Sequence, residues 1–317
     1  MAMNQTETIK SPSGRMATSP ATTHKHGLFG RWRRASPLAL LYAAAVLLFY
    51  TTIFLIPFGT AIWLSFQNWD FLTTPKFVGL RNFVKALSDD YFWQALKVSL
   101  MFSAVEIILG VGFALLLALA LSHVRNKPQR FFLVLYYLPV VTPTVASIYL
   151  WRWLYRPTGG TLNALLAAVG LPEQPFLASP SQALWCITAM VIWANVGGAA
   201  VILLAGMNDV PESLYEAARL DGAGFWQMFF KITMPLIRPV LVYQVVVSVI
   251  GTVQMFEPFF LIPGPGFSTR TLSLYTYQLG FQTLNLGYGA AVSLIIFVLL
   301  LFATVFQLQR WQVNWEH

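Results

Sequence analysis

The chain has 317 residues, of which 57% are hydrophobic and only 10% are charged. A soluble domain carries about 25% charged residues, because its surface must be polar. This deficit excludes an ordinary soluble domain and indicates that lipid covers part of the surface. The net charge of +8 does not indicate nucleic-acid binding, because many of the basic residues stand in the N-terminal tail or in loops between apolar runs.

The chain begins with a polar segment and continues with long apolar runs. Residues 1–34 are rich in Ser, Thr and Pro and predict a disordered, basic cytoplasmic tail. The next run, Ala35–Trp69, carries no charge and is far longer than the core of a cleaved signal peptide, about 7–15 residues. About 20 residues cross a bilayer as a helix. Five more runs meet this test: Ala95–Ser122, Phe131–Trp151, Leu184–Met207, Leu236–Ile262 and Leu286–Gln309.

These runs predict an all-α integral membrane protein, a bundle of about six transmembrane helices over residues 35–310 with a short cytoplasmic C-terminal tail, 311–317. Lys and Arg are more numerous on the side of the N-terminus, which places both termini in the cytoplasm. Pro139 and Pro143 predict a kink in the third span. An apolar stretch, Leu162–Val169, predicts an interfacial helix in an outer segment.

The inner loop 208–235 predicts a helix, a tight turn and a second helix. Asp209 is expected to cap the first helix, with Glu212 three residues later completing a capping-box-like pair. Gly222 is expected to end that helix in a left-handed conformation. The second helix is expected over Phe225–Ile232.

The first of these helices carries a surface suited to a partner. Leu214, Ala217 and Ala218 share one face by their i, i+3, i+4 spacing. Small side chains there let another backbone approach closely, and Glu216 adds a charge at the rim. The pattern predicts a knob that inserts into a groove on a cytoplasmic protein.

The same loop resembles the signature of ABC importer permeases. That signature reads Glu-Ala-Ala, three residues, Gly, nine residues, Ile, one residue, Leu-Pro. This chain has Glu216-Ala217-Ala218, then Gly222, Ile232 and Met234-Pro235, so only Met234 departs from it.

Further elements resemble the carbohydrate-uptake branch, and within it the first permease of the maltose and glycerol-phosphate type. Asp221-Gly222-Ala223-Gly224 and Phe229–Thr233 extend the signature as that branch does. Gly79-Leu80-Arg81-Asn82-Phe83 resembles its Gly-Leu-x-Asn-aromatic element, and Phe256-Glu257 with Thr271-Leu272 resembles elements nearer the C-terminus.

The resemblance implies a transport subunit of the bacterial inner membrane that moves a sugar or sugar-like solute inward. The expected partners are a second permease, two ATP-binding subunits and an extracytoplasmic solute-binding protein. The sequence lacks a Gly-x4-Gly-Lys-Ser/Thr phosphate loop, so the chain is expected not to be an enzyme and to hold no cofactor, with ATP and Mg bound by the partner ATPase. The residues expected to contact that ATPase are Leu214, Glu216, Ala217, Ala218, Asp221, Gly222 and Ala223.

Polar residues inside the spans are candidates for the solute path. In the fifth span Gln244, Ser248, Thr252 and Met255 fall on one helical face. The resemblance to maltose-type permeases implies that Ser248, Thr252 and Met255 lie near the family's solute cavity, together with Asn195 of the fourth span. Trp193 is a further candidate. Ordinary helix packing by polar and small side chains is the competing interpretation, and it is favoured for Gly197-Gly198. Glu106 is either a gate residue or a buried structural partner.

Two other classes of function are weighed against the permease. A secondary transporter or channel needs its own coupling-ion site, and only Glu106 and the peripheral Glu257 are available in the spans. A membrane scaffold would leave the inner loop unexplained. The four histidines are scattered and the single cysteine, Cys186, lies in an apolar run, so neither a metal site nor a nucleophile–base pair is expected.

Overall fold

A computed structural model describes residues 36–124 and 127–311. The predicted tails, 1–34 and 311–317, lie outside the described residues except for Trp311. By its internal contacts the chain divides into two units, Met1–Pro57 and Phe58–His317. The described part of the first unit is helical and begins at Pro37, where the Ser36 hydroxyl accepts a hydrogen bond of 3.2 Å from Ala39 N–H. Its elements are α2 Pro37–Tyr50, the π-helical turn η1 Thr51–Leu55 and the start of α3 Ile56–Ser65.

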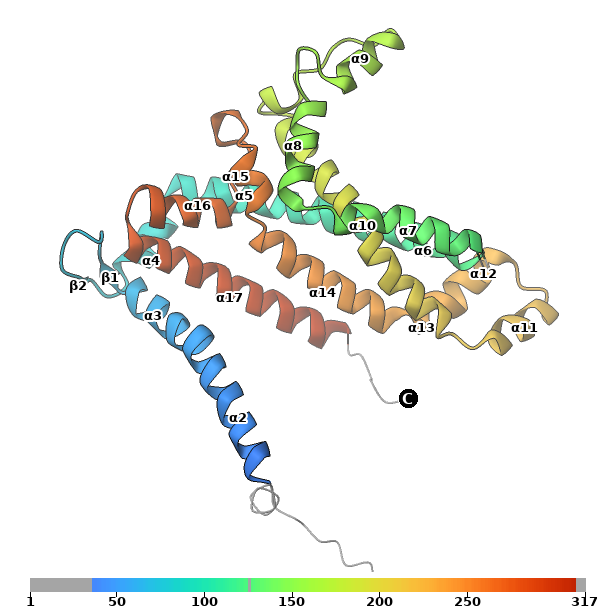
Figure 1. Ribbon diagram of the computed structural model, residues 1–317, viewed down its shortest axis with the longest axis horizontal. Helices are drawn as coiled ribbons and strands as arrows, with labels where there is room; N and C mark the ends of the chain where they lie inside the picture. The colour runs from blue at the N-terminus through green and yellow to red at the C-terminus, as the bar shows by residue number, and fades with distance from the viewer. Residues whose placement is uncertain (1–35, 125–126, 312–317) are drawn as a thin grey trace, which may run out of the picture. The chain divides into compact units, whose positions relative to one another are not determined.

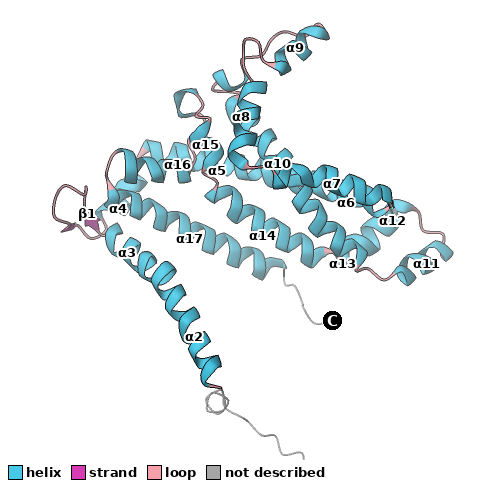
Figure 2. Ribbon diagram, in the orientation of Figure 1, coloured by secondary structure: helices cyan, strands magenta, loops and turns pink. Residues whose placement is uncertain are grey.

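The second unit is also helical apart from one short hairpin (Figures 1 and 2). Before the signature loop its elements are β1 Gln67–Asn68, β2 Lys76–Phe77, α4 Arg81–Leu87, α5 Asp90–Val105, η2 Glu106–Val111, α6 Gly112–Ser122, α7 Lys127–Val141, α8 Thr144–Leu154, α9 Thr161–Ala168, η3 Phe176–Ala178 and α10 Ala183–Asn208. From the loop onward they are α11 Glu212–Leu220, α12 Phe225–Met228, η4 Phe229–Thr233, α13 Met234–Leu236, α14 Arg238–Gln254, α15 Glu257–Leu261, η5 Pro265–Phe267, α16 Leu272–Tyr277, η6 Gln278–Gln282 and α17 Leu286–Trp311.

Five described helices are long and apolar enough to span a membrane, and they match five of the six predicted runs. They are Pro37–Ser65, Asp90–Ser122, Ala183–Asn208, Arg238–Leu261 and Leu286–Trp311. The sixth run is a bent pair, α7 and α8, whose axes meet at 93°. The predicted all-α fold of about six spans is confirmed, and a helix, α9, forms at the position where an interfacial helix is expected.

The bend in the third run is sharper than the kink that the sequence predicts. Pro143 stands between the two helices with an extended backbone, φ −54° and ψ 125°. Proline disfavours the helical conformation of the residue before it, and its ring crowds the carbonyl four residues back; Pro139 is tolerated inside α7, but Pro143 is not part of a helix. The chain therefore breaks at 142–143 and turns through a right angle.

Helix α10 lies at the centre of the second unit, in contact with α6, α7 and α14 (Figure 1). Its small residues allow close approach. A Cβ on Gly197 would overlap the backbone carbonyl of Tyr136 in α7, whereas a Cβ on Gly198 would lie at an ordinary 3.7 Å from Val140. The expectation that this glycine pair serves close packing therefore agrees with the structure at Gly197.

The Gly-Leu-x-Asn-aromatic element has a structural task next to β1. Asn82, which is buried, donates hydrogen bonds from its amide nitrogen to the carbonyls of Ser65 (2.9 Å) and Gln67 (2.8 Å). The start of α17 packs on the same segment, since a Cβ on Gly287 would overlap the Gln67 carbonyl. Asn82 thus ties the end of α3 to the hairpin that follows it.

Candidate functional site

The signature loop folds as a helix, a turn and a second helix, as the sequence predicts, but its first cap differs. Helix α10 extends to Asn208, and Asp209 is the residue that ends it. Pro211 occupies the cap position of α11, and it has no side-chain group that could make a capping hydrogen bond. The predicted capping role of Asp209 is therefore wrong, because the preceding span runs further than its apolar pattern indicates.

Gly222 ends α11 in the left-handed conformation, with φ +75°. The turn is closed by hydrogen bonds from Gly222 N–H to Arg219 O (3.1 Å) and from Ala223 N–H to Ala218 O (2.9 Å). Only glycine adopts this conformation readily. The second helix, α12, starts at Phe225 and continues through the π-turn η4 into α13, which contains Pro235, so it runs further than the expected end at Ile232.

Helix α11 presents apolar side chains to its surroundings, because none of its residues is buried. Leu220 is 90% exposed and Leu214 is 42% exposed, and Glu216 and Ala217 are exposed beside them. Ala218 is partly covered. The face that the sequence assigns to a partner is thus uncovered in the described chain, and its contact with an ATPase remains a prediction.

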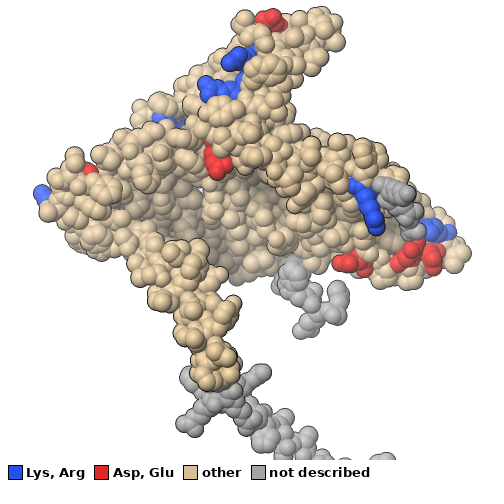
Figure 3. Space-filling view, viewed as in Figure 1, with Lys and Arg blue, Asp and Glu red and all other residues tan. Residues whose placement is uncertain are grey.

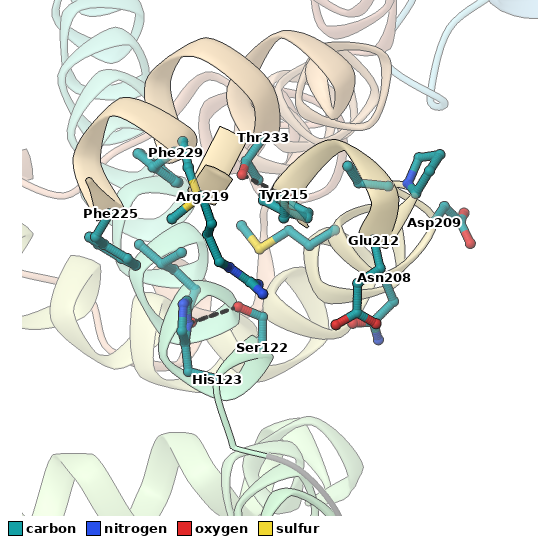
Figure 4. A pocket seen from close by; sticks show the side chains of 15 residues that line it. Ser122, His123, Asn208, Asp209, Glu212, Tyr215, Arg219, Phe225, Phe229 and Thr233 are labelled. Carbon is teal, nitrogen blue, oxygen red and sulfur yellow. Dashed lines mark hydrogen bonds between the residues drawn. The ribbon is translucent and has the colours of Figure 1, made fainter. Parts of the chain in front are cut away.

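A pocket of about 650 Å³ lies behind α11, between the end of α6 and the start of α12 (Figure 4). The Tyr215 hydroxyl hydrogen-bonds to the Thr233 hydroxyl (2.8 Å), which holds α11 on the second helix. The rings of His123 and Phe225 meet across the pocket with centroids 5.2 Å apart. The loop is therefore attached to the spans through α6 as well as through its own two ends.

Charged side chains of the second unit gather at its ends (Figure 3). Figure 3 shows Lys, Arg, Asp and Glu near α11 and α12, near α8 and α9, and at the hairpin end by α4, with an isolated acidic group beside α15 and little other charge on the surface between these regions. Such a surface is typical of helices embedded in hydrocarbon. The signature loop lies in one of the charged ends.

Five of the six predicted solute-path residues line a second pocket, of about 340 Å³, between the Glu106 turn, α10 and α14. Gln244, Ser248 and Thr252 come from α14, Met255 is the residue that ends α14, and Asn195 comes from α10. The shared face that the spacing predicts is therefore present. Asn195 and Met255 also line a smaller hollow of about 120 Å³ beside Pro139 and Ser147.

One predicted solute-path residue lies outside this pocket, and one residue whose role the sequence leaves open lies in it. Trp193 is not among the residues lining this pocket; its ring packs on Trp151, with centroids 5.5 Å apart. Glu106, whose role the sequence leaves open, lines the pocket and is only 5% exposed. In the sequence Glu106 stands out only as a carboxylate within an apolar span. The fold is what places it in the same pocket as Gln244.

A third polar group, which the sequence does not reveal, joins α5, α16 and α17. The Asp89 carboxylate accepts hydrogen bonds from the hydroxyls of Tyr275 and Tyr288, each 2.5 Å long, and caps α5 through Tyr91 N–H (2.9 Å). Burial raises the pKa of Asp89, but the hydrogen bonds from Tyr275 and Tyr288 act in the opposite direction, and the pKa lies below its usual value. Arg270 stacks beside this group, with its guanidinium carbon 3.5 Å from the centre of the Phe267 ring. The charged Asp89 therefore links three helices.

Known proteins with similar sequences are transport proteins. Residues 110–315 match the family described as binding-protein-dependent transport system inner membrane component. The probable ABC transporter permease YesP of Bacillus subtilis is 33% identical over 270 residues, which are 82% of this chain and 86% of that protein. The trehalose/maltose transport system permease MalF of Thermococcus litoralis is 32% identical over 286 residues, 87% of this chain and 94% of that protein.

Solved structures agree with the sequence comparison. A bacterial ABC transporter involved in the import of the acidic polysaccharide alginate contains a chain that superposes with a TM-score of 0.79 at 25% identity, covering 90% of this chain and 99% of that one. The same type of transporter in complex with an alginate-bound periplasmic protein gives a TM-score of 0.75 at 26% identity, covering 84% and 92%. With its helical spans and its signature loop, this chain belongs to the inner-membrane permease components of binding-protein-dependent ABC transport systems.

Proposed function

We propose that this permease imports a sugar or sugar-like solute, driven by ATP hydrolysis in a separate subunit that docks on the 208–235 loop. The observation that carries the proposal is the uncovered α11, whose Glu-Ala-Ala segment is followed by Gly222 at φ +75°. Leu214 is 42% exposed and Ala217, on the same face, is exposed as well, so this face is open to a partner.

In this proposal α11 enters a groove on the ATPase. Leu214, Ala217 and Ala218 would pack against it, and Glu216 would pair with a basic residue at the rim. Asp221, Gly222 and Ala223 would set the angle between α11 and α12. Movement of α11 would reach the spans through the Tyr215–Thr233 hydrogen bond and through α12, which continues into α13 and α14.

The remaining partners follow from the relatives. A second permease would complete the translocation path, two ATP-binding subunits would lie on the cytoplasmic side and an extracytoplasmic binding protein would deliver the solute. Both termini would be cytoplasmic. Relatives named for trehalose/maltose, lactose and sn-glycerol-3-phosphate transport support a sugar-like solute.

The test is a graded set of glycine variants in the assembled transporter. The chain is co-expressed with its chromosomal neighbours, purified in detergent and placed in proteoliposomes for measurement of ATP-driven sugar uptake. Gly222→Pro should abolish uptake, because proline holds φ near −65°. Gly222→Ala should reduce uptake partially, since a left-handed alanine costs about 1–2 kcal/mol.

Gly224→Ala is the matched control, because Gly224 has an ordinary φ of −77° and open space around its Cβ position. It should leave uptake unchanged. Normal ATP-driven uptake by correctly assembled Gly222→Pro would refute the coupling role. Purification of the wild-type chain alone, without a second permease or an ATPase, would refute the proposed function.

A further inference from the structure

Two buried hydrogen-bond acceptors in the polar pocket have no donor. Glu106 and Gln244 are 5% and 7% exposed, and both line the pocket. Among the described residues, neither Glu106 Oε2 nor Gln244 Oε1 has a hydrogen-bond partner. Buried polar atoms are nearly always paired in folded proteins, and an unpaired one marks a missing partner. Both acceptors belong to residues that line the same pocket.

The local backbone accommodates the carboxylate rather than covering it. Glu106 begins a π-turn, η2, in an otherwise α-helical span, and such turns are frequent at functional sites. Gly110, one turn later, leaves the space beside the carboxylate, because a Cβ there would lie 3.3 Å from Glu106 Oε1. On the other wall, the Gln244 amide nitrogen makes a long contact of 3.5 Å with the Ser248 hydroxyl, which leaves its oxygen free.

A solute that bonds to both oxygens has to bring hydrogen-bond donors into the pocket. Adjacent hydroxyl groups of a sugar ring are suitable donors, because one carboxylate can accept from two of them. The volume of about 340 Å³ falls within the range of small-molecule sites. The other polar groups on the wall, Asn195, Ser248 and Thr252, can bond further hydroxyls.

The charge of the wall discriminates between solutes. Of the described residues that line the pocket, Glu106 is the one that can carry a charge, and neither Lys nor Arg is among them. A phosphate or carboxylate group in the pocket would meet a carboxylate and no cation. Buried anionic groups need a cation or several N–H donors.

We propose, on the basis of the proposed function above, that Glu106 is a specificity-determining residue of the solute path. Together with Gln244 it binds the hydroxyl groups of an uncharged polyhydroxy solute and rejects solutes that carry a phosphate or carboxylate.

The experiment measures solute preference in the assembled transporter. ATP-driven uptake into proteoliposomes is compared for uncharged sugars (maltose, trehalose, raffinose), acidic solutes (digalacturonate, glycerol 3-phosphate) and the amino sugar glucosamine. The wild type should transport an uncharged sugar with the highest kcat/KM. Glu106→Gln keeps the size of the side chain and one acceptor but removes the charge. It should lower kcat/KM for the uncharged sugar about tenfold and raise the ratio of acidic to uncharged uptake by about the same factor.

Two further variants separate specificity from folding. Glu106→Asp keeps the charge on a shorter side chain, so it should lower kcat/KM without changing the ratio. Glu257→Gln makes the same chemical change at an exposed carboxylate that does not line the pocket, and it should change neither quantity. Each variant is first shown to assemble by size-exclusion chromatography.

The outcomes are distinguishable. A wild type that prefers an acidic solute or glucosamine would overturn the inference and leave the proposed function standing. So would a Glu106→Gln variant that lowers uptake of every solute equally, since a structural role predicts that result. Absence of ATP-driven uptake for the whole panel would refute the proposed function itself.

Discussion

Substitution of Gly197 by alanine tests the close packing of α7 on α10. The new Cβ would overlap the Tyr136 carbonyl oxygen, and it would lie 2.7 Å from the carbonyl carbon and 3.2 Å from the Tyr137 Cα. All three are backbone atoms, so no side-chain rotation can relieve the clash. Helix α7 must instead move away from α10.

The expected magnitude follows from what each glycine contacts. Overpacking of a tight interface costs about 1–3 kcal/mol. Alanine also favours a helix over glycine by about 0.5–1 kcal/mol, but this gain applies equally to the neighbouring Gly198, whose Cβ would meet only Val140 at 3.7 Å. The difference between Gly197→Ala and Gly198→Ala therefore isolates the clash.

The assay is thermal unfolding of the detergent-purified protein, followed by the loss of its monodisperse size-exclusion peak. Gly197→Ala should lower the midpoint by about 3–10 °C relative to Gly198→Ala, from the usual relation between free energy and melting temperature in chains of this size. Equal midpoints for the two variants would show that α7 and α10 are not in backbone contact, and would refute the packing described above.

Two more predictions concern the ends of the spans. Hydrogen bonds hold the pKa of Asp89 below its usual value, so its charge contributes stability that is present above the unfolded pKa of about 3.9 and is lost as the pH falls through the lower folded pKa. The Asp89→Asn variant should therefore melt below the wild type at pH 7 and approach it near pH 3. The variant Asp90→Asn, at an exposed residue, should follow the wild type at every pH. Asn82→Ala should destabilise the protein by about 2–4 kcal/mol, because it leaves two carbonyl groups without donors; a melting midpoint equal to that of the exposed Arg81→Ala would contradict this account.

Most of the fold could be predicted from local patterns in the sequence. Spans were predictable because lipid requires long apolar helices, and the turn at Gly222 was predictable because a left-handed helix end favours glycine. The shared face of Gln244, Ser248, Thr252 and Met255 followed from helical spacing alone.

The features that could not be predicted depend on contacts between residues far apart in the sequence. Asp89 lies 186 and 199 residues from its two tyrosine partners, Tyr275 and Tyr288, and no periodicity links such positions. Glu106 was visible as an intramembrane carboxylate, but its place opposite Gln244 depends on how three helices pack. The capping role assigned to Asp209 was wrong because a favourable cap residue can equally well end the preceding helix, as it does here.

The right-angle bend between α7 and α8 bears on which parts of the permease can move. The two prolines stand four positions apart, so in a straight helix the ring of Pro143 would press on the carbonyl of Pro139, a conflict of about 3 kcal/mol. Pro143, at the bend, has no N–H group to donate to a helix. The Thr142 hydroxyl donates a hydrogen bond to the Leu138 carbonyl (2.9 Å) at the end of α7. Joining α7 and α8 into one straight helix would thus cost free energy through the clash at Pro143 and would gain no backbone hydrogen bond from that residue. We expect α7 and α8 to move as one rigid body during the transport cycle, with the motion located where this pair contacts other helices.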